Sequence, residues 1–112
     1  MRRFDWATKF LVITTSVFVL QGCAVTAVSP EATNVRVISE AQATDCVFVD
    51  NVATSNGNTL IEDPEQDARN KAFNRVAVLG GDSLRIVSTN SQIAPSGVGS
   101  IFSLSGEVYR CD

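Results

Sequence analysis

The segment DPEQDARNKAFNRVAVLGG (residues 63–81) carries the clearest structural pattern in the chain. Asp63 stands before Pro64, and Gln66 follows three residues after Asp63, which is the capping pattern of a helix that begins at Pro64. The pair Gly80-Gly81 is typical of a helix end, because glycine readily adopts the left-handed conformation after the last turn. This pattern predicts a helix that ends just before the two glycines.

The predicted helix, residues 64–79, has one apolar face. Apolar residues recur at the spacing of helical turns, and they are Ala68, Ala72, Val76 and Leu79, with Phe73 and Ala77 beside them. Two pairs of opposite charges four residues apart also support a helix, Glu65 with Arg69 and Asp67 with Lys71. We expect the helix to lie close to a sheet, because alanine side chains permit a close approach.

Four segments around this helix have strand patterns, at residues 34–38, 45–52, 84–88 and 101–111. The segment 45–52 has apolar residues on both faces, which favours a central, covered strand. Gly106 in the last segment predicts a bulge or a close backbone approach. The polar residues 39–44 are interpreted as a connection. The stretch Thr89–Ser100 is rich in Gly, Ser and Pro, and it predicts a mobile loop.

The predicted order is β-β-α-β-β. One amphipathic helix on a small sheet is a two-layer α+β fold. The chain has 112 residues, which is enough for one small domain. We therefore expect a single α+β domain over residues 34–112.

The N-terminus has the pattern of a secretory signal peptide. Arg2, Arg3 and Lys9 precede an apolar run over residues 10–20. An alternative is a transmembrane anchor, but this run is much shorter than the roughly 20 apolar residues that cross a bilayer. The pattern favours a signal peptide over residues 1–22.

Leu20-Gln21-Gly22-Cys23 resembles the lipobox of bacterial lipoproteins. The resemblance implies cleavage between Gly22 and Cys23 and lipidation of Cys23, with residues 23–33 as the lipidated Cys and its tether. Ala24 is similar to the residue that follows the lipidated cysteine in outer-membrane lipoproteins. The alternative is an ordinary cleaved signal peptide with Cys23 as a structural thiol.

Lipidation of Cys23 leaves two cysteines, Cys46 and Cys111. An even number of cysteines in an exported, oxidising compartment favours one disulfide. The alternative is a redox-active thiol pair, which typically has the close spacing C-x-x-C, and that motif is absent.

The amino-acid composition argues against several classes of function. The chain has no His, which excludes Ser-His-Asp and Cys-His catalysis and His-based metal sites. We expect no catalytic residue, no metal ligand and no cofactor, and we interpret Glu62, Asp63, Glu65 and Asp67 as helix capping and a solvated face. The part after residue 22 has 6 basic and 11 acidic side chains, a net charge of −5, which argues against nucleic-acid binding. Membrane attachment is then expected through the lipid on Cys23.

Three motifs carry a further resemblance, DARNKA (67–72), VLGGDSL (78–84) and GEVYRC (106–111). The chain resembles a family of small uncharacterised proteobacterial lipoproteins, and it is more distantly similar to RcsF, an outer-membrane stress-sensor lipoprotein. The resemblance implies the same fold and supports the pairing of Cys46 with Cys111.

We hypothesise a non-catalytic lipoprotein in the outer membrane, with its domain on the periplasmic side. The domain would bind another envelope protein as an adaptor or stress sensor, through Thr89–Ser100 or an exposed sheet edge. The alternative is a small-ligand or metal-binding periplasmic module.

Overall fold

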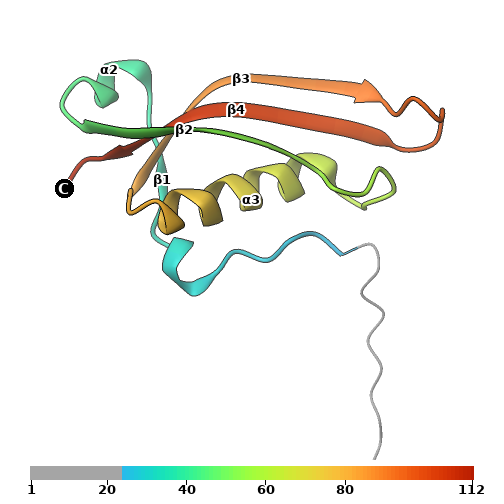
Figure 1. Cartoon of the computed structure of the whole chain (residues 1–112), viewed down its shortest axis with the longest axis horizontal. Helices are drawn as coiled ribbons and strands as arrows, with labels where there is room; N and C mark the ends of the chain where they lie inside the picture. The colour runs from blue at the N-terminus through green and yellow to red at the C-terminus, as the bar shows by residue number, and fades with distance from the viewer. Residues whose placement is uncertain (1–23) are drawn as a thin grey trace, which may run out of the picture.

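The computed structural model describes residues 24–112. The predicted signal peptide, its cleavage site after Gly22 and the lipidation site Cys23 lie outside the described residues. In chain order the elements are η2 (Pro30–Ala32), β1 (Arg36–Val37), α2 (Glu40–Ala43), β2 (Val47–Ser55), α3 (Pro64–Val78), β3 (Ser83–Ile93) and β4 (Ser100–Arg110) (Figure 1).

The four strands form one sheet in the order β1-β3-β4-β2. Strand β4 is antiparallel to both of its neighbours, β3 and β2, whereas the short strand β1 is parallel to β3. Helix α3 packs along one face of the sheet (Figure 1). The predicted two-layer α+β fold is therefore confirmed.

The core lies between α3 and the sheet. It contains Val52, Ala72, Val76, Leu84, Leu104 and Val108. Ala68, Ala72 and Val76 of the predicted apolar face are fully buried, so this face was correctly identified. The small alanines bring the helix close enough for the Thr54 hydroxyl of β2 to donate to the Ala68 carbonyl at 2.9 Å.

The ends of α3 follow from its sequence. The Asp63 carboxylate accepts a hydrogen bond from the Gln66 backbone N–H at 3.1 Å, which confirms the predicted N-cap. At the other end, Gly80 has φ of 84°, and the Gly81 N–H donates to the Val76 carbonyl at 3.0 Å. This is the glycine-dependent helix end that the pair Gly80-Gly81 predicted.

The expectation that the strand at 45–52 is central was wrong. Strand β2 lies at the edge of the sheet, because β4, which comes last in the chain, inserts between β2 and β3. A register shift between Phe48 and Asp50 explains the misleading pattern. It places Val49 and Val52 on the core face although they are three residues apart, while Phe48 contacts Tyr109 on the opposite face.

Half of the expected mobile loop Thr89–Ser100 is strand. Residues as far as Ile93 belong to β3, and Ser100 begins β4, so that the connection covers residues 94–99. The Thr, Asn, Ser and Gln side chains of residues 89–92 suit an exposed strand as well as a loop. The expected connection at 39–44 contains the short helix α2, which is capped reciprocally by Ser39 and Gln42.

Gly106 confirms the predicted close approach. A Cβ atom at this position would lie 2.8 Å from the Arg85 carbonyl oxygen. The register shift that accompanies it is in the neighbouring strand β3, between Ile86 and Ser88.

Residues 24–33, expected as a tether, lie along α3 instead of extending freely. The Thr26 N–H donates to Asp67 Oδ1 at 2.7 Å, and Asn70 Nδ2 donates to the Thr26 carbonyl at 2.8 Å. One helical turn later, Asn74 Oδ1 accepts from the Ser29 N–H at 2.8 Å. Any free spacer between residue 23 and the domain is therefore shorter than the sequence suggested.

Candidate functional site

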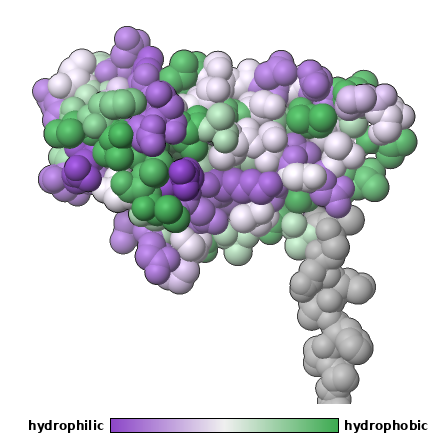
Figure 2. Space-filling model, in the orientation of Figure 1, coloured by the Kyte–Doolittle hydropathy of each residue, from purple (hydrophilic) through white to green (hydrophobic). Residues whose placement is uncertain are grey.

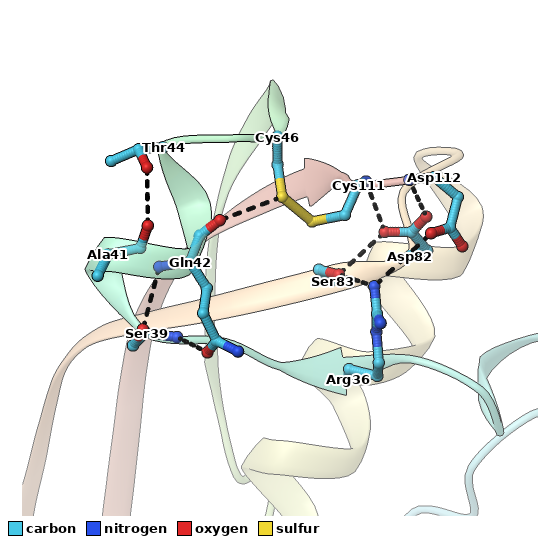
Figure 3. Close-up of a disulfide and its surroundings, with 10 residues drawn as sticks. All are labelled: Arg36, Ser39, Ala41, Gln42, Thr44, Cys46, Asp82, Ser83, Cys111 and Asp112. Atoms are coloured by element: carbon cyan, nitrogen blue, oxygen red, sulfur yellow. Dashed lines mark hydrogen bonds and ion pairs between the residues drawn. A yellow bond between two sulfur atoms is a disulfide. The ribbon is translucent and has the colours of Figure 1, made fainter.

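The predicted disulfide is present. Cys46 and Cys111 are joined across a separation of 65 residues (Figure 3). Cys46 directly precedes β2 and Cys111 directly follows β4, so the bond ties the paired ends of these two strands together. The Gln42 carbonyl oxygen of α2 lies 3.4 Å from Cys46 Sγ. The bond therefore links the ends of β2 and β4 covalently at one end of the sheet.

Asp82 holds the C-terminal residues beside this disulfide. Its Oδ1 accepts hydrogen bonds from the Cys111 N–H and the Ser83 hydroxyl, both at 2.9 Å, and its Oδ2 accepts from the Asp112 N–H at 3.3 Å (Figure 3). Burial raises the pKa of Asp82, but the hydrogen bonds that it accepts and the charge of Arg36 outweigh burial, so the pKa lies below its ordinary value.

A polar cluster lies on the sheet face opposite α3. Glu107 of β4 accepts two hydrogen bonds on the same oxygen, from Arg85 Nη1 at 2.7 Å and from the Tyr109 hydroxyl at 2.8 Å. Arg85 Nη2 also lies 3.6 Å from Glu40 of α2. Strand pairing aligns this cluster, because Arg85 is directly opposite Glu107 in the register of β3 and β4.

Hydrogen bonds and charges within the cluster shift the pKa values of Glu107 and Tyr109. The hydrogen bond from Tyr109 lowers the pKa of Glu107, with help from Arg85. The same hydrogen bond raises the pKa of Tyr109 above its ordinary value, because the phenolate would face the Glu107 carboxylate. At neutral pH the cluster therefore holds an ionised Glu107 and a protonated Tyr109.

Two shallow cavities meet at Glu107 on this open face. One, of about 320 Å³, is lined by Glu40, Ala43, Thr44, Arg85, Glu107 and Tyr109. The other, of about 390 Å³, is lined by Asn51, Val52, Ala53, Val87, Ser105, Gly106 and Glu107. The arrangement could hold a small polar ligand by hydrogen bonds. The resemblance to known families did not single out Arg85 or Glu40, because only the fold brings them to Glu107.

The outer edge of β3 is the second candidate site. Strand β1 pairs with β3 only at Ser83 and Leu84. Among the residues that the structure describes, no other strand pairs with this side of β3, so the edge from Ile86 to Ile93 is open. We call these eight residues the β3 edge. The sequence contains no charged residue between Ile86 and Gly106.

The four acidic residues at the start of α3 differ in their exposure to solvent. Glu62, Asp63 and Glu65 are exposed, as expected. Asp67 is 1% exposed, because the Thr26 segment covers it. Burial raises the pKa of Asp67, but the hydrogen bonds from Thr26 and the charge of Lys71 outweigh burial, so the pKa lies below its ordinary value.

In the described part of the chain, no group of three or more His, Cys, Asp or Glu residues is arranged to hold a metal ion. A helix long and apolar enough to cross a membrane does not occur within residues 24–112.

The fold and the disulfide define a small, two-layer α+β domain in which a covalent bond links two strands at one end of the sheet. The chain belongs to the family described as Domain of unknown function (DUF4156), which matches residues 26–111. The matched range begins at Thr26, whose backbone is hydrogen-bonded to side chains of α3, and it ends at Cys111, the second cysteine of the disulfide.

Among solved structures, the chain is similar to the solution NMR structure of the secreted protein STM0082 of Salmonella typhimurium LT2. The TM-score is 0.52 and the sequence identity is 19%, over 86% of this chain and 88% of that chain. At this identity the similarity shows a shared fold alone. No curated protein matches the chain.

Proposed function

We propose that this chain is a non-catalytic lipoprotein, anchored in the outer membrane through Cys23, whose domain faces the periplasm and binds another envelope protein. The signal-peptide pattern and the lipobox-like Leu20-Gln21-Gly22-Cys23 support export and anchoring. The structural relative is described as a secreted protein, and the disulfide suits an oxidising compartment.

The observation that carries the protein-binding proposal is the open β3 edge. Alternate backbone N–H and C=O groups of an edge strand point outward, and an extended segment of another chain can pair with them. Natural proteins commonly protect such edges with charged side chains or proline. The β3 edge has neither, and its side chains from Val87 to Ile93 are exposed.

The other edge of the sheet is less suitable. Both edge strands contain one register shift, between Phe48 and Asp50 in β2 and between Ile86 and Ser88 in β3, so the two edges differ in the groups that lie along β2. Asp50 adds a charge there, and Lys71 Nζ already donates to the Ser55 carbonyl at 3.0 Å. We therefore assign the partner to the β3 edge, as an extended, uncharged segment that adds a strand to the sheet.

The experiment is in-cell photocrosslinking from position 90 of the full-length protein. We expect one dominant adduct with an envelope protein from Asn90, and no such adduct from Arg75, which is exposed on α3. The adduct should then be lost when Gln92→Lys places a charge on the β3 edge.

A matched control separates the edge from the open face. Asn90 and Ser103 are directly paired neighbours on the same face, but Ser103 is in the central strand β4. Ser103→Lys should therefore leave the adduct intact. An adduct that survives Gln92→Lys would contradict strand addition at this edge.

A stress-sensing role, by similarity to RcsF, is the more specific form of this proposal. It predicts that the crosslinked partner changes when the envelope is damaged. An adduct that is the same with and without envelope stress would favour a constitutive adaptor.

The alternative is a small-ligand module, which the cluster of Arg85, Glu107 and Tyr109 favours. Its two adjoining cavities offer charged and hydroxyl groups to a polar ligand. A ligand that binds there should raise the melting temperature of the wild-type domain and not that of Glu107→Gln. Envelope glycans and divalent cations are the first compounds to test.

A further inference from the structure

Three exposed apolar side chains gather at the end of the molecule that holds the β3–β4 turn. They are Leu60 (56% exposed), Ile93 (73%) and Val98 (57%), and we call them the apolar tip. Figure 2 shows hydrophobic surface at this end, on the right of the view.

The two loops of the apolar tip form one unit. The Ser100 N–H donates to the Thr59 carbonyl at 3.1 Å. The buried Asn56 side chain donates to the Ser100 carbonyl at 2.9 Å and accepts from the Phe102 N–H at 2.8 Å. These bonds join residues 56–60 to the β3–β4 turn, so the three apolar side chains are held in place together.

The N-terminal segment leaves the domain at this same end. Residues 56–63 lead directly into the first turn of α3. Thr26 is bound by Asp67 and Asn70, in the first half of that helix. Figure 1 shows the segment that contains Thr26 running beneath the N-terminal half of α3, on the same side of the molecule as the β3–β4 turn.

The distance to the predicted anchor is short. Cys23 is three residues before Thr26, and three extended residues reach about 10–11 Å. Because α3 holds Thr26 in place, the acyl chains on Cys23 would keep this end of the domain at the lipid surface.

The charged residues near the apolar tip indicate which kind of lipid surface the tip could contact. Residues 51–61 and 86–106 contain no charged side chain, while Glu62, Asp63 and Glu65 lie beside the tip at the start of α3. These acidic groups would be repelled by anionic lipid. The tip therefore suits the apolar and zwitterionic part of a membrane surface.

We propose that the apolar tip is a second membrane contact, in which Leu60, Ile93 and Val98 enter the lipid surface beside the acyl chains of Cys23. This inference rests on the lipid anchor of the proposed function. The contact would stand the domain on its tip, so that the sheet rises from the membrane and the β3 edge faces sideways.

The test uses tryptophan as a reporter, because Trp6 lies in the signal peptide and the mature protein has no other. Val98→Trp and Leu60→Trp place the reporter in the tip. Val78→Trp is the matched control, since Val78 is equally apolar, 73% exposed and at the opposite end of α3. Each lipidated protein is purified from envelopes and reconstituted into vesicles of phosphatidylethanolamine and phosphatidylglycerol at a ratio of about three to one, with brominated acyl chains as the quencher.

Flotation with the vesicles shows whether the lipid on Cys23 anchors the protein. Quenching shows whether the apolar tip enters the lipid. We expect all three variants to float, with at least two-fold quenching of V98W and L60W and none of V78W. Omission of phosphatidylglycerol, the anionic lipid, should not reduce the quenching. Variants that float without quenching at either tip position would overturn the second contact and leave the anchor intact. Protein that does not float would overturn the anchor, and the tip contact with it.

Discussion

Tyr109 is the best single-residue probe of the open face, because it is the only tyrosine in the chain. Its hydroxyl donates to Glu107, and ionisation of the hydroxyl would break this bond and place two negative charges together. The pKa of Tyr109 is therefore raised above the ordinary value of 10.0.

We predict that spectrophotometric titration of the mature domain gives a tyrosine pKa above 10.0. Glu107→Gln should move this pKa down towards the ordinary value, because the variant lacks the negative charge beside the phenolate. Ser103→Ala, in the same strand, should leave the pKa unchanged. A pKa that does not respond to Glu107→Gln would show that the hydrogen bond is absent in solution.

Gly106 gives a second single-residue prediction. In Gly106→Ala the new Cβ would lie 2.8 Å from the Arg85 carbonyl oxygen and 3.0 Å from Leu84 Cδ1, both in the packed sheet. Overpacking of this kind costs about 1–3 kcal/mol of unfolding free energy, measurable by urea denaturation. Gly57→Ala is the control, because its new Cβ would meet only the movable end of Lys71 at 3.3 Å. Equal stability of both variants would contradict the close approach.

Helix α3 has two roles, since one face builds the core and another binds the N-terminal segment. Asp67, Asn70 and Asn74 bind backbone groups of residues 26–29, and Asn74 does so with both ends of its amide, since its Nδ2 donates to the Ala27 carbonyl at 3.0 Å. The spacing of these residues places them along one line of the helix. The contact fixes where the N-terminal chain leaves the domain.

This contact predicts a pH dependence. The pKa of Asp67 in the folded protein lies below its ordinary value of 3.8. A lowered folded pKa contributes stability that is complete above the unfolded pKa and is lost as the pH falls through the folded pKa. Asp67→Asn should therefore destabilise the domain by about 1–3 kcal/mol at pH 7.

The same variant should differ less from wild type at acidic pH, as the pH falls through the lowered folded pKa of Asp67 and the wild-type carboxyl also becomes neutral. Urea unfolding at both pH values measures the difference. An equal deficit at both values would mean that the charge of Asp67 does not contribute.

For the molecule as a whole, the disulfide is the main covalent constraint. It closes a loop between residues 65 apart in sequence, which stabilises the domain by about 4 kcal/mol in the chain-entropy model. This is a large part of the roughly 5–15 kcal/mol of a typical domain. We predict that the double variant Cys46→Ser, Cys111→Ser unfolds at a clearly lower urea concentration, and that reduction of the wild type has the same effect. An unchanged midpoint would show that the sheet holds its end without the bond.

Local sequence patterns predicted α3 well, because a helix is built from contacts between residues close in the chain. Its cap at Asp63, the helical spacing of its alanines and its end at Gly80 all depend on neighbours within a few turns. The strands were located but not ordered. The edge position of β2 depends on β4, whose pairing residues lie between 48 (Ser55 with Ser103) and 63 (Val47 with Arg110) positions away.

The same distinction applies to the candidate sites. The pairing of Cys46 with Cys111 could be predicted because only two cysteines follow residue 23. The cluster of Arg85, Glu107 and Tyr109 could not, since β3 and β4 must pair before these side chains meet.

From its amino acids alone, this chain specifies one amphipathic helix, the number of its main strands, an N-terminal export pattern and a single possible disulfide after residue 23. These properties follow from composition and from interactions local in the chain. The strand order, the open β3 edge, the burial of Asp67 and the apolar tip arise only on folding. Each of them requires segments far apart in sequence to meet, and no local pattern specifies which segments these are.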